Sequence, residues 1–124
     1  MAKAPADFSV RPIAHAKGDV TVVEFRDRRL IDAVQIEKLG REILNLIAKS
    51  RLPKFILSFR NVEFLSSTAL NALIQIENAI RLKKGQLRLA DLDPQLQKVF
   101  TIMKLQKVMP ICDSTEEAVK SLET

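Results

Sequence analysis

Residues 55–70 read FILSFRNVEFLSSTAL, and this stretch decides the fold. The run Phe55–Phe59 is short and apolar, which predicts a strand buried on both faces. After a loop over residues 60–65 come three consecutive hydroxyl side chains, Ser66, Ser67 and Thr68, directly before a helical pattern. The apolar positions of that helix recur at three or four residues, and Gly85 is expected to end it: Ala69, Leu70, Leu73, Ile74, Ile76 and Ile80.

Two strands and a helix are predicted upstream of this unit. Residues 8–13 alternate and contain Pro12, which is typical of an edge strand, and a turn at Gly18-Asp19 leads into a β-branched strand over residues 20–25. Asp32, with Gln35 three positions later, has the pattern of a capping box. The helix that follows is expected to run to about Lys49 on an apolar stripe: Ile36, Leu39, Ile43 and Ile47.

Downstream, Leu87 and Leu89 alternate with polar residues in a strand over residues 86–90, and Asp93-Pro94 is typical of a helix start. The apolar stripe expected for that helix is Leu96, Val99, Phe100 and Met103. Residues 108–111 are predicted to be a last short strand, placed at an edge by Pro110. Ser114 and Glu117 have the pattern of a capping box for a final helix, which carries Ala118, Val119 and Leu122.

The resulting order, β-β-α-β-α-β-α-β-α, predicts an α/β fold in which about four helices surround a small mixed sheet of four to five strands. In such a sheet the loops that follow parallel strands leave at one edge, where binding sites are usually built. We therefore expect residues 66–68, 91–94 and 113–115 to meet at this edge, together with Asp32.

Size and composition indicate one domain spanning residues 1–124, with its core at about 8–122. The chain has 124 residues and a mass of 14.0 kDa, with 47% hydrophobic and 28% charged residues. Its apolar runs are far shorter than the ~18 residues that a membrane span needs. The start, Met1–Pro5, lacks the pattern of a secretory signal, so we expect a cytoplasmic protein.

The residues do not predict a catalytic or a metal-binding site. The single His15 is expected in a loop, and the single Cys112 reads as a small apolar residue, so neither predicts a nucleophile. Aspartates at one edge would suit magnesium and phosphoryl transfer: Asp32, Asp91, Asp93 and Asp113. However, the central strand ends in Ser58-Phe59, without a carboxylate to accept a phosphoryl group. We expect no cofactor and no metal.

The formal net charge of +5 is compatible with an acidic partner, a membrane surface or nucleic acid. The chain has neither Trp nor Tyr for stacking on bases, so direct binding of nucleic acid is not expected. The main basic cluster, Arg81, Lys83, Lys84 and Arg88, lies where lysines complement a helix dipole. No membrane partner is expected.

The three hydroxyls at residues 66–68 have two explanations. One of them can cap the helix, but capping needs only one hydroxyl. The free N–H groups and the positive dipole end at a helix start also stabilise a phosphate. The residues alone leave both explanations open.

Asn61–Leu70 resembles the signature of STAS domains, the fold of bacterial anti-sigma-factor antagonists, in which two apolar residues precede Asp-Ser-Ser/Thr-Gly-Leu. The likeness covers about residues 8–122 and includes Leu30-Ile31-Asp32, Gly85–Leu89 and Asp113–Ala118. It implies that a partner serine kinase, which doubles as an anti-sigma factor, phosphorylates Ser67, with Thr68 and Ser66 as alternates.

The chain departs from this signature at two positions. Ser66 replaces the acidic residue and Ala69 replaces the glycine, while Ser58 stands where the family often has an aspartate. Asp32 matches the family's loop aspartate. The implied partner-binding residues are Asp32, Ser66, Ser67, Thr68 and Ala69.

Two hypotheses follow. The first is an antagonist, a monomer or weak dimer, that binds a kinase-type anti-sigma factor until Ser67 is phosphorylated. The second is a STAS scaffold or ligand-sensing module that does not switch.

Overall fold

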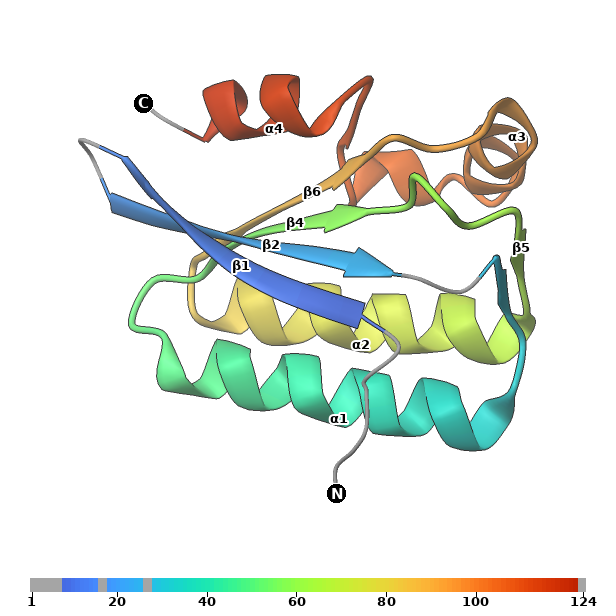
Figure 1. The fold of residues 1–124 in the computed structure, drawn as a ribbon, viewed down its shortest axis with the longest axis horizontal. Coiled ribbons are helices and arrows are strands. Elements are labelled where there is room, and N and C mark those ends of the chain that lie inside the picture. The colour runs from blue at the N-terminus through green and yellow to red at the C-terminus, as the bar shows by residue number, and fades with distance from the viewer. Residues whose placement is uncertain (1–7, 16–17, 26–27, 123–124) are drawn as a thin grey trace.

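The computed structural model describes residues 8–15, 18–25 and 28–122. A five-stranded sheet lies at its centre (Figure 1), in the order β1 (Phe8–His15), β2 (Gly18–Phe25), β4 (Lys54–Ser58), β6 (Gln86–Ala90) and β7 (Ile111–Cys112). β1 and β2 form an antiparallel hairpin, and the other neighbours are parallel. The predicted mixed sheet is therefore confirmed, with β4 in the middle as expected.

Helices cover both faces of this sheet. α1 (Ala33–Lys49) and α2 (Ser67–Leu82) lie side by side on one face, and α4 (Thr115–Ser121) lies on the other (Figure 1). α3 (Pro94–Ile102) packs near the end of the sheet where β4 and β6 finish. The stripe of α1 faces the core as predicted, and so does that of α2 except for the exposed Ile74. The buried members are Ile36, Leu39, Ile43, Ile47, Ala69, Leu70, Leu73, Ile76 and Ile80.

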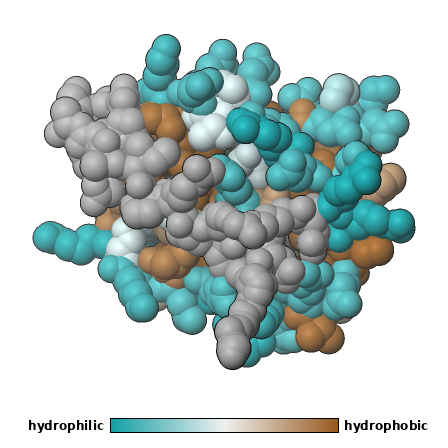
Figure 2. Space-filling view, viewed as in Figure 1, coloured by the Kyte–Doolittle hydropathy of each residue, from teal (hydrophilic) through white to brown (hydrophobic). Residues whose placement is uncertain are grey.

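Burial on both faces of β4 explains its uninterrupted apolar sequence. Phe55 and Leu57 belong to the core under α1 and α2, whereas Ile56 belongs to the core under α4. Phe59 follows the strand and lies between Phe25 and Phe100, with ring centroids 5.1 Å and 6.3 Å away. The outer surface is mostly hydrophilic on the face shown in Figure 2, with separate hydrophobic patches.

A second sheet was not predicted. β3 (Arg29–Leu30) and β5 (Phe64–Leu65) pair in parallel beside the main sheet. The Arg28 carbonyl accepts hydrogen bonds from the N–H groups of Glu63 and Phe64, at 2.7 and 3.1 Å. Two residues are too few to show the alternation that marks a strand in a sequence.

The predicted last strand is wrong in position. Leu105–Lys107 form a 3₁₀ turn, Val108 is exposed, and β7 begins only at Ile111. Pro110 has no N–H to donate to β6, so the ladder cannot extend further back. The Leu87 carbonyl instead accepts a hydrogen bond from the Arg88 guanidinium at 3.0 Å.

Expectations for the first hairpin and for α3 also need correction. Gly18 and Asp19 were expected to form the turn, but both already belong to β2 and pair with β1. His15 is the last residue of β1 and not a loop residue, because the hairpin pairs it with Gly18. In α3 only Leu96 and Phe100 of the expected stripe are buried. Val99 and Met103 are 37% and 49% exposed, because this nine-residue helix packs through a narrow stripe.

Gly85 does not end α2 in the way that was predicted. The left-handed residue is Lys84, with φ 60°, and the N–H groups of Lys84 and Gly85 donate to the carbonyls of Arg81 and Ile80. Gly85 is needed for a different reason, because a Cβ atom there would lie 2.3 Å from the Pro53 carbonyl oxygen.

Gly85→Ala should therefore lower the free energy of unfolding by about 1–3 kcal/mol, the usual cost of overpacking. Gly40→Ala is the matched control, because its new Cβ would meet the Ala72 Cβ at an ordinary 3.8 Å. In the middle of α1 that alanine should stabilise by about 0.5–1 kcal/mol. Urea unfolding of both variants measures the difference, and equal effects would contradict the packing argument.

Candidate functional site

The acceptor turn, defined as residues 66–69, begins α2 directly after β5. Ser66 is the N-cap: its Oγ accepts a hydrogen bond from the Ala69 N–H at 3.2 Å, and its N–H donates to the Leu30 carbonyl at 3.0 Å. Ser67 and Thr68 are exposed and take no part in the cap. The capping and phosphate-acceptor explanations therefore fall on different residues.

Asp32 occupies the same position on α1 that Ser66 occupies on α2. Its Oδ1 accepts a hydrogen bond from the Gln35 N–H at 3.0 Å, which confirms the predicted N-cap. Leu30 and Leu65, which pair in the small sheet, precede the two caps by two residues and one residue. The pairing of β3 with β5 thus brings Asp32 and the acceptor turn to one edge of the molecule.

An open groove lies beside the acceptor turn and was not predicted. Ser67 and Thr68 form one end of it, and Leu70, Asn71, Ile74 and Met103 form the rest. Ile74 and Met103 were both assigned to buried stripes, yet they are 37% and 49% exposed. Two exposed apolar residues, one on α2 and one directly after α3, are the signal that marks this groove, and it appears only once the helices are packed.

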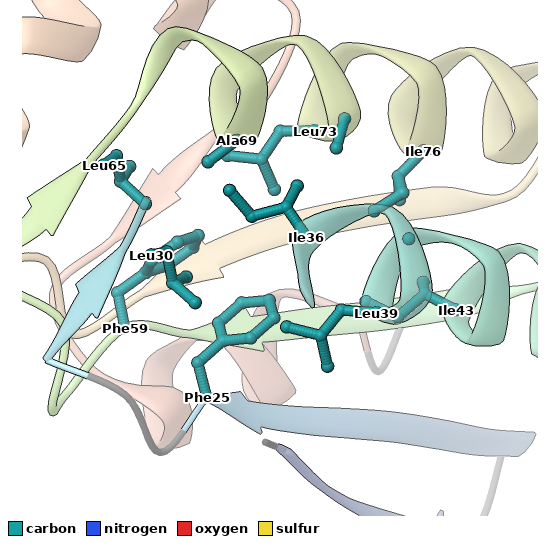
Figure 3. Close-up of a pocket in the computed structure, with 12 residues that line it drawn as sticks. Phe25, Leu30, Ile36, Leu39, Ile43, Phe59, Leu65, Ala69, Leu73 and Ile76 are labelled. Carbon is teal, nitrogen blue, oxygen red and sulfur yellow. The ribbon is translucent and has the colours of Figure 1, made fainter. Parts of the chain in front are cut away.

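The core under the acceptor turn holds an apolar pocket between α1, α2 and the sheet (Figure 3). Ala69 is 5% exposed and lines this pocket with Leu30, Leu65 and Phe59. All of its lining residues are apolar or glycine, so it offers no group for acid–base chemistry or metal binding. The burial of Ala69 in the surrounding core anchors the acceptor turn by packing.

Asp91 joins three elements at the same edge. Its Oδ2 accepts hydrogen bonds from the Ser58 Oγ at 2.8 Å and the Thr115 Oγ1 at 2.6 Å, and the Arg60 guanidinium lies 3.8 Å away. Ser58 ends β4 and is 3% exposed, Asp91 follows β6, and Thr115 begins α4. These contacts confirm the expected meeting for the loops that follow β6 and β7.

The other candidates are separate from this cluster. Asp93 caps α3 through the Gln95 N–H at 3.1 Å, and Asp113 is exposed before α4. Cys112 is half-buried at the end of β7, and the side chain of His15 lies outside the described residues. Within the described ranges, no three His, Cys, Asp or Glu side chains gather closely enough to hold a metal ion.

These features, a mixed sheet with an exposed hydroxyl turn at the start of its central helix, define the class. A family model described as STAS domain matches residues 11–118, and the chain belongs to this family. An anti-sigma F factor antagonist of Paenibacillus polymyxa is 27% identical over 77 residues, which cover 62% of this chain and 66% of that protein, just under two thirds of its length.

Solved structures show the same fold. An anti-sigma-factor antagonist (STAS) domain protein from Planctomyces limnophilus is 21% identical with a TM-score of 0.80, covering 93% of this chain and 98% of that one. The Bacillus cell fate determinant SpoIIAA in its phosphorylated form is 18% identical with a TM-score of 0.67, covering 92% and 97%. In the described part of the chain, no helix is both long and apolar enough to cross a bilayer.

Ser66→Ala should lower the free energy of unfolding by about 1 kcal/mol, because it removes the cap acceptor. Ser67→Ala should change it little, and Ser66→Asp should preserve it, because aspartate caps as well as serine. Urea denaturation of the three variants tests this. If Ser67→Ala lowered the free energy of unfolding more than Ser66→Ala, Ser67 and not Ser66 would be the cap of α2.

Asp91→Ala should cost about 2–3 kcal/mol, because it leaves the buried Ser58 hydroxyl without its charged acceptor. In a Ser58→Ala background the same change should cost clearly less, and the double-mutant cycle cancels any strain from an alanine at the positive φ of residue 91. Purely additive losses would mean that this hydrogen bond contributes nothing to stability.

Proposed function

We propose that this chain is an anti-sigma-factor antagonist that binds a serine-kinase anti-sigma factor and is released when Ser67 is phosphorylated. The observation that carries the proposal is the division of roles in the acceptor turn. Ser66 supplies the cap, and Ser67 leaves an exposed hydroxyl at the start of α2. The Paenibacillus relative is an anti-sigma F factor antagonist, and SpoIIAA, which shares the fold, exists in a phosphorylated form.

The switch follows from charge. In the transfer, the Ser67 Oγ forms a bond to the γ-phosphorus of ATP, the bond to ADP breaks, and the hydroxyl proton passes to a base on the kinase. The phosphoserine adds a charge of about −1.5 to −2 at pH 7. A helix N-terminus stabilises that charge, so the domain stays folded, whereas an interface shaped for a neutral hydroxyl must bury it.

The proposed partner surface is centred on Ser67 and includes Asp32, Ser66 and Thr68. Ala69 contributes by packing under the turn, since its side chain is buried. The groove that runs from Ser67 past Ile74 to Met103 extends this surface with apolar area. Apolar residues next to Ser67 make the interface sensitive to a new charge. The free energy of desolvating a charge is highest where no polar or oppositely charged group is near it.

The partner is expected to be a protein and not nucleic acid. Three of the four clustered cations have partners within the chain: Arg81 with Glu77, Lys83 with the end of α1, and Arg88 with Ser121. The protein would act in the cytoplasm as a monomer or weak dimer, by binding and without catalysis or a cofactor.

A second candidate is a STAS scaffold or ligand-sensing module that does not switch. The specific observation in its favour is Ser66, which replaces the acidic residue of the STAS signature beside the acceptor. Ser58 also stands where the family often has an aspartate. In this structure a carboxylate near the end of β4 comes instead from Asp91, on the loop after β6, which accepts a hydrogen bond from Ser58.

Ser67→Ala should abolish phosphorylation and keep partner binding, because the loss of one exposed hydroxyl changes little surface. Ser67→Asp should weaken binding at least tenfold, because it places a charge in the interface. Phosphopeptide mapping after incubation with ATP and the kinase, and titration calorimetry of both variants, measure these effects. Asn45→Asp, which adds the same charge on the exposed face of α1, is the control and should leave binding unchanged.

The outcomes separate the two candidates. Label on Thr68 alone would move the acceptor by one residue. Absence of label, with binding that Ser67→Asp leaves intact, would favour the scaffold.

A further inference from the structure

The end of the molecule opposite the acceptor turn includes two adjacent turns, beside the end of the β1–β2 hairpin and the last residues of α4 (Figure 1). Residues 49–54 lead from α1 into β4, and residues 81–88 lead from α2 into β6. Both helices start at the acceptor edge and run away from it, so their last residues meet at this far end (Figure 1). We call five of the exposed residues of these turns the cationic end: Lys49, Arg51, Leu52, Leu82 and Lys84.

The two turns are held rigidly against each other. The Lys83 Nζ donates hydrogen bonds to the carbonyls of Ile47, Ala48 and Ser50, at 3.1, 2.7 and 2.7 Å. The Gln86 N–H donates to the Pro53 carbonyl at 2.8 Å, next to the close approach of Gly85. The backbones of the two turns therefore keep fixed positions relative to each other.

Charge in these two segments has one sign. They contain no acidic residue and seven cations: Lys49, Arg51, Lys54, Arg81, Lys83, Lys84 and Arg88. Four of the seven cations have partners within the chain. Lys83 binds the carbonyls described above, Lys54 binds the Leu122 carbonyl, Arg81 pairs with Glu77, and Arg88 donates to the Ser121 hydroxyl. The exposed Lys49, Arg51 and Lys84 have no such partner among the described residues.

Two leucines stand among these free cations. Leu82 is 85% exposed and Leu52 is 55% exposed. At this exposure Leu82 projects from the surface with little protein around it, whereas Leu52 is partly covered by its neighbours. Neither helix capping nor core packing accounts for the two leucines.

We propose that the cationic end docks reversibly on an anionic lipid surface, with Leu52 and Leu82 entering the interface and Lys49, Arg51 and Lys84 facing the headgroups. A bilayer surface adapts to a projecting apolar side chain, whereas an acidic protein would need a matching cavity. This revises the expectation that the chain has no membrane partner. It is independent of the proposed phosphorylation, since the acceptor turn lies at the other end and stays free.

Flotation of the full chain with vesicles measures the docking. The chain should float with vesicles of 70% phosphatidylcholine and 30% phosphatidylserine at 0.1 M salt, and remain unbound with pure phosphatidylcholine or at 0.5 M salt. Arg51→Gln with Lys84→Gln should lower the partition coefficient about 30-fold, from about fivefold per charge. Leu52→Gln with Leu82→Gln should lower it at least tenfold at unchanged charge.

Matched controls keep the test specific. Lys38→Gln with Lys98→Gln removes the same charge elsewhere on exposed helix faces, and Val34→Gln with Ile102→Gln replaces equally exposed apolar residues near the acceptor edge. Both should change the partition less than threefold. Equal losses in the controls, or no flotation with the anionic vesicles, would overturn the proposal. Binding to poly-glutamate without flotation would show that the partner of the cationic end is an acidic protein and not a lipid surface.

Discussion

Strand β4 is buried on both faces and paired in parallel on both edges, and the rest of the architecture depends on this constraint. Parallel neighbours require a crossover on each side, and right-handed crossovers place α1 and α2 on the same face. Those two helices must then begin at the edge where β2 and β4 end. Every loop that carries a candidate residue is delivered to that edge by this arrangement, whatever the loop's own sequence.

The small pairing of β3 with β5 converts this general arrangement into a defined site. It fixes the Leu30 carbonyl where the Ser66 N–H can reach it, so the first residue of the acceptor turn is held from both sides, by β3 and by its own helix. Ser67 follows a restrained residue and shares its helical turn with the buried Ala69. An exposed side chain on a rigid turn can be modified or bound at a small entropic cost, because little has to be ordered.

The sequence predicted the features that rest on strong local patterns. The helices with caps at Asp32 and Asp93 and the buried strand at β4 are of this kind, because capping and periodicity act over a few residues. The prediction failed where a nonlocal partner decides. Gly85 lies against the Pro53 carbonyl, where a Cβ atom does not fit, and the left-handed residue is therefore Lys84. β7 is short because Pro110 has no N–H to donate to β6. The groove at Met103 and the Asp91 cluster likewise depend on how helices and strands meet.

The parallel course of α1 and α2 also gives the two ends of the molecule different electrostatics. Unpaired N–H groups and positive dipole ends gather at the acceptor edge, and unpaired carbonyls gather at the far end. Cations stabilise the unpaired carbonyls at the far end. Lys83, at the end of α2, does so by donating hydrogen bonds to three carbonyls at the end of α1. This stabilisation accounts for Lys83 and Lys54, which bind carbonyls. It does not account for Arg51, which extends the positive field beyond the carbonyls, or for Leu82, which gains nothing from a helix dipole. The unpaired cations and the two exposed leucines at this end therefore point outward, to something that the chain meets and not to something that the chain contains.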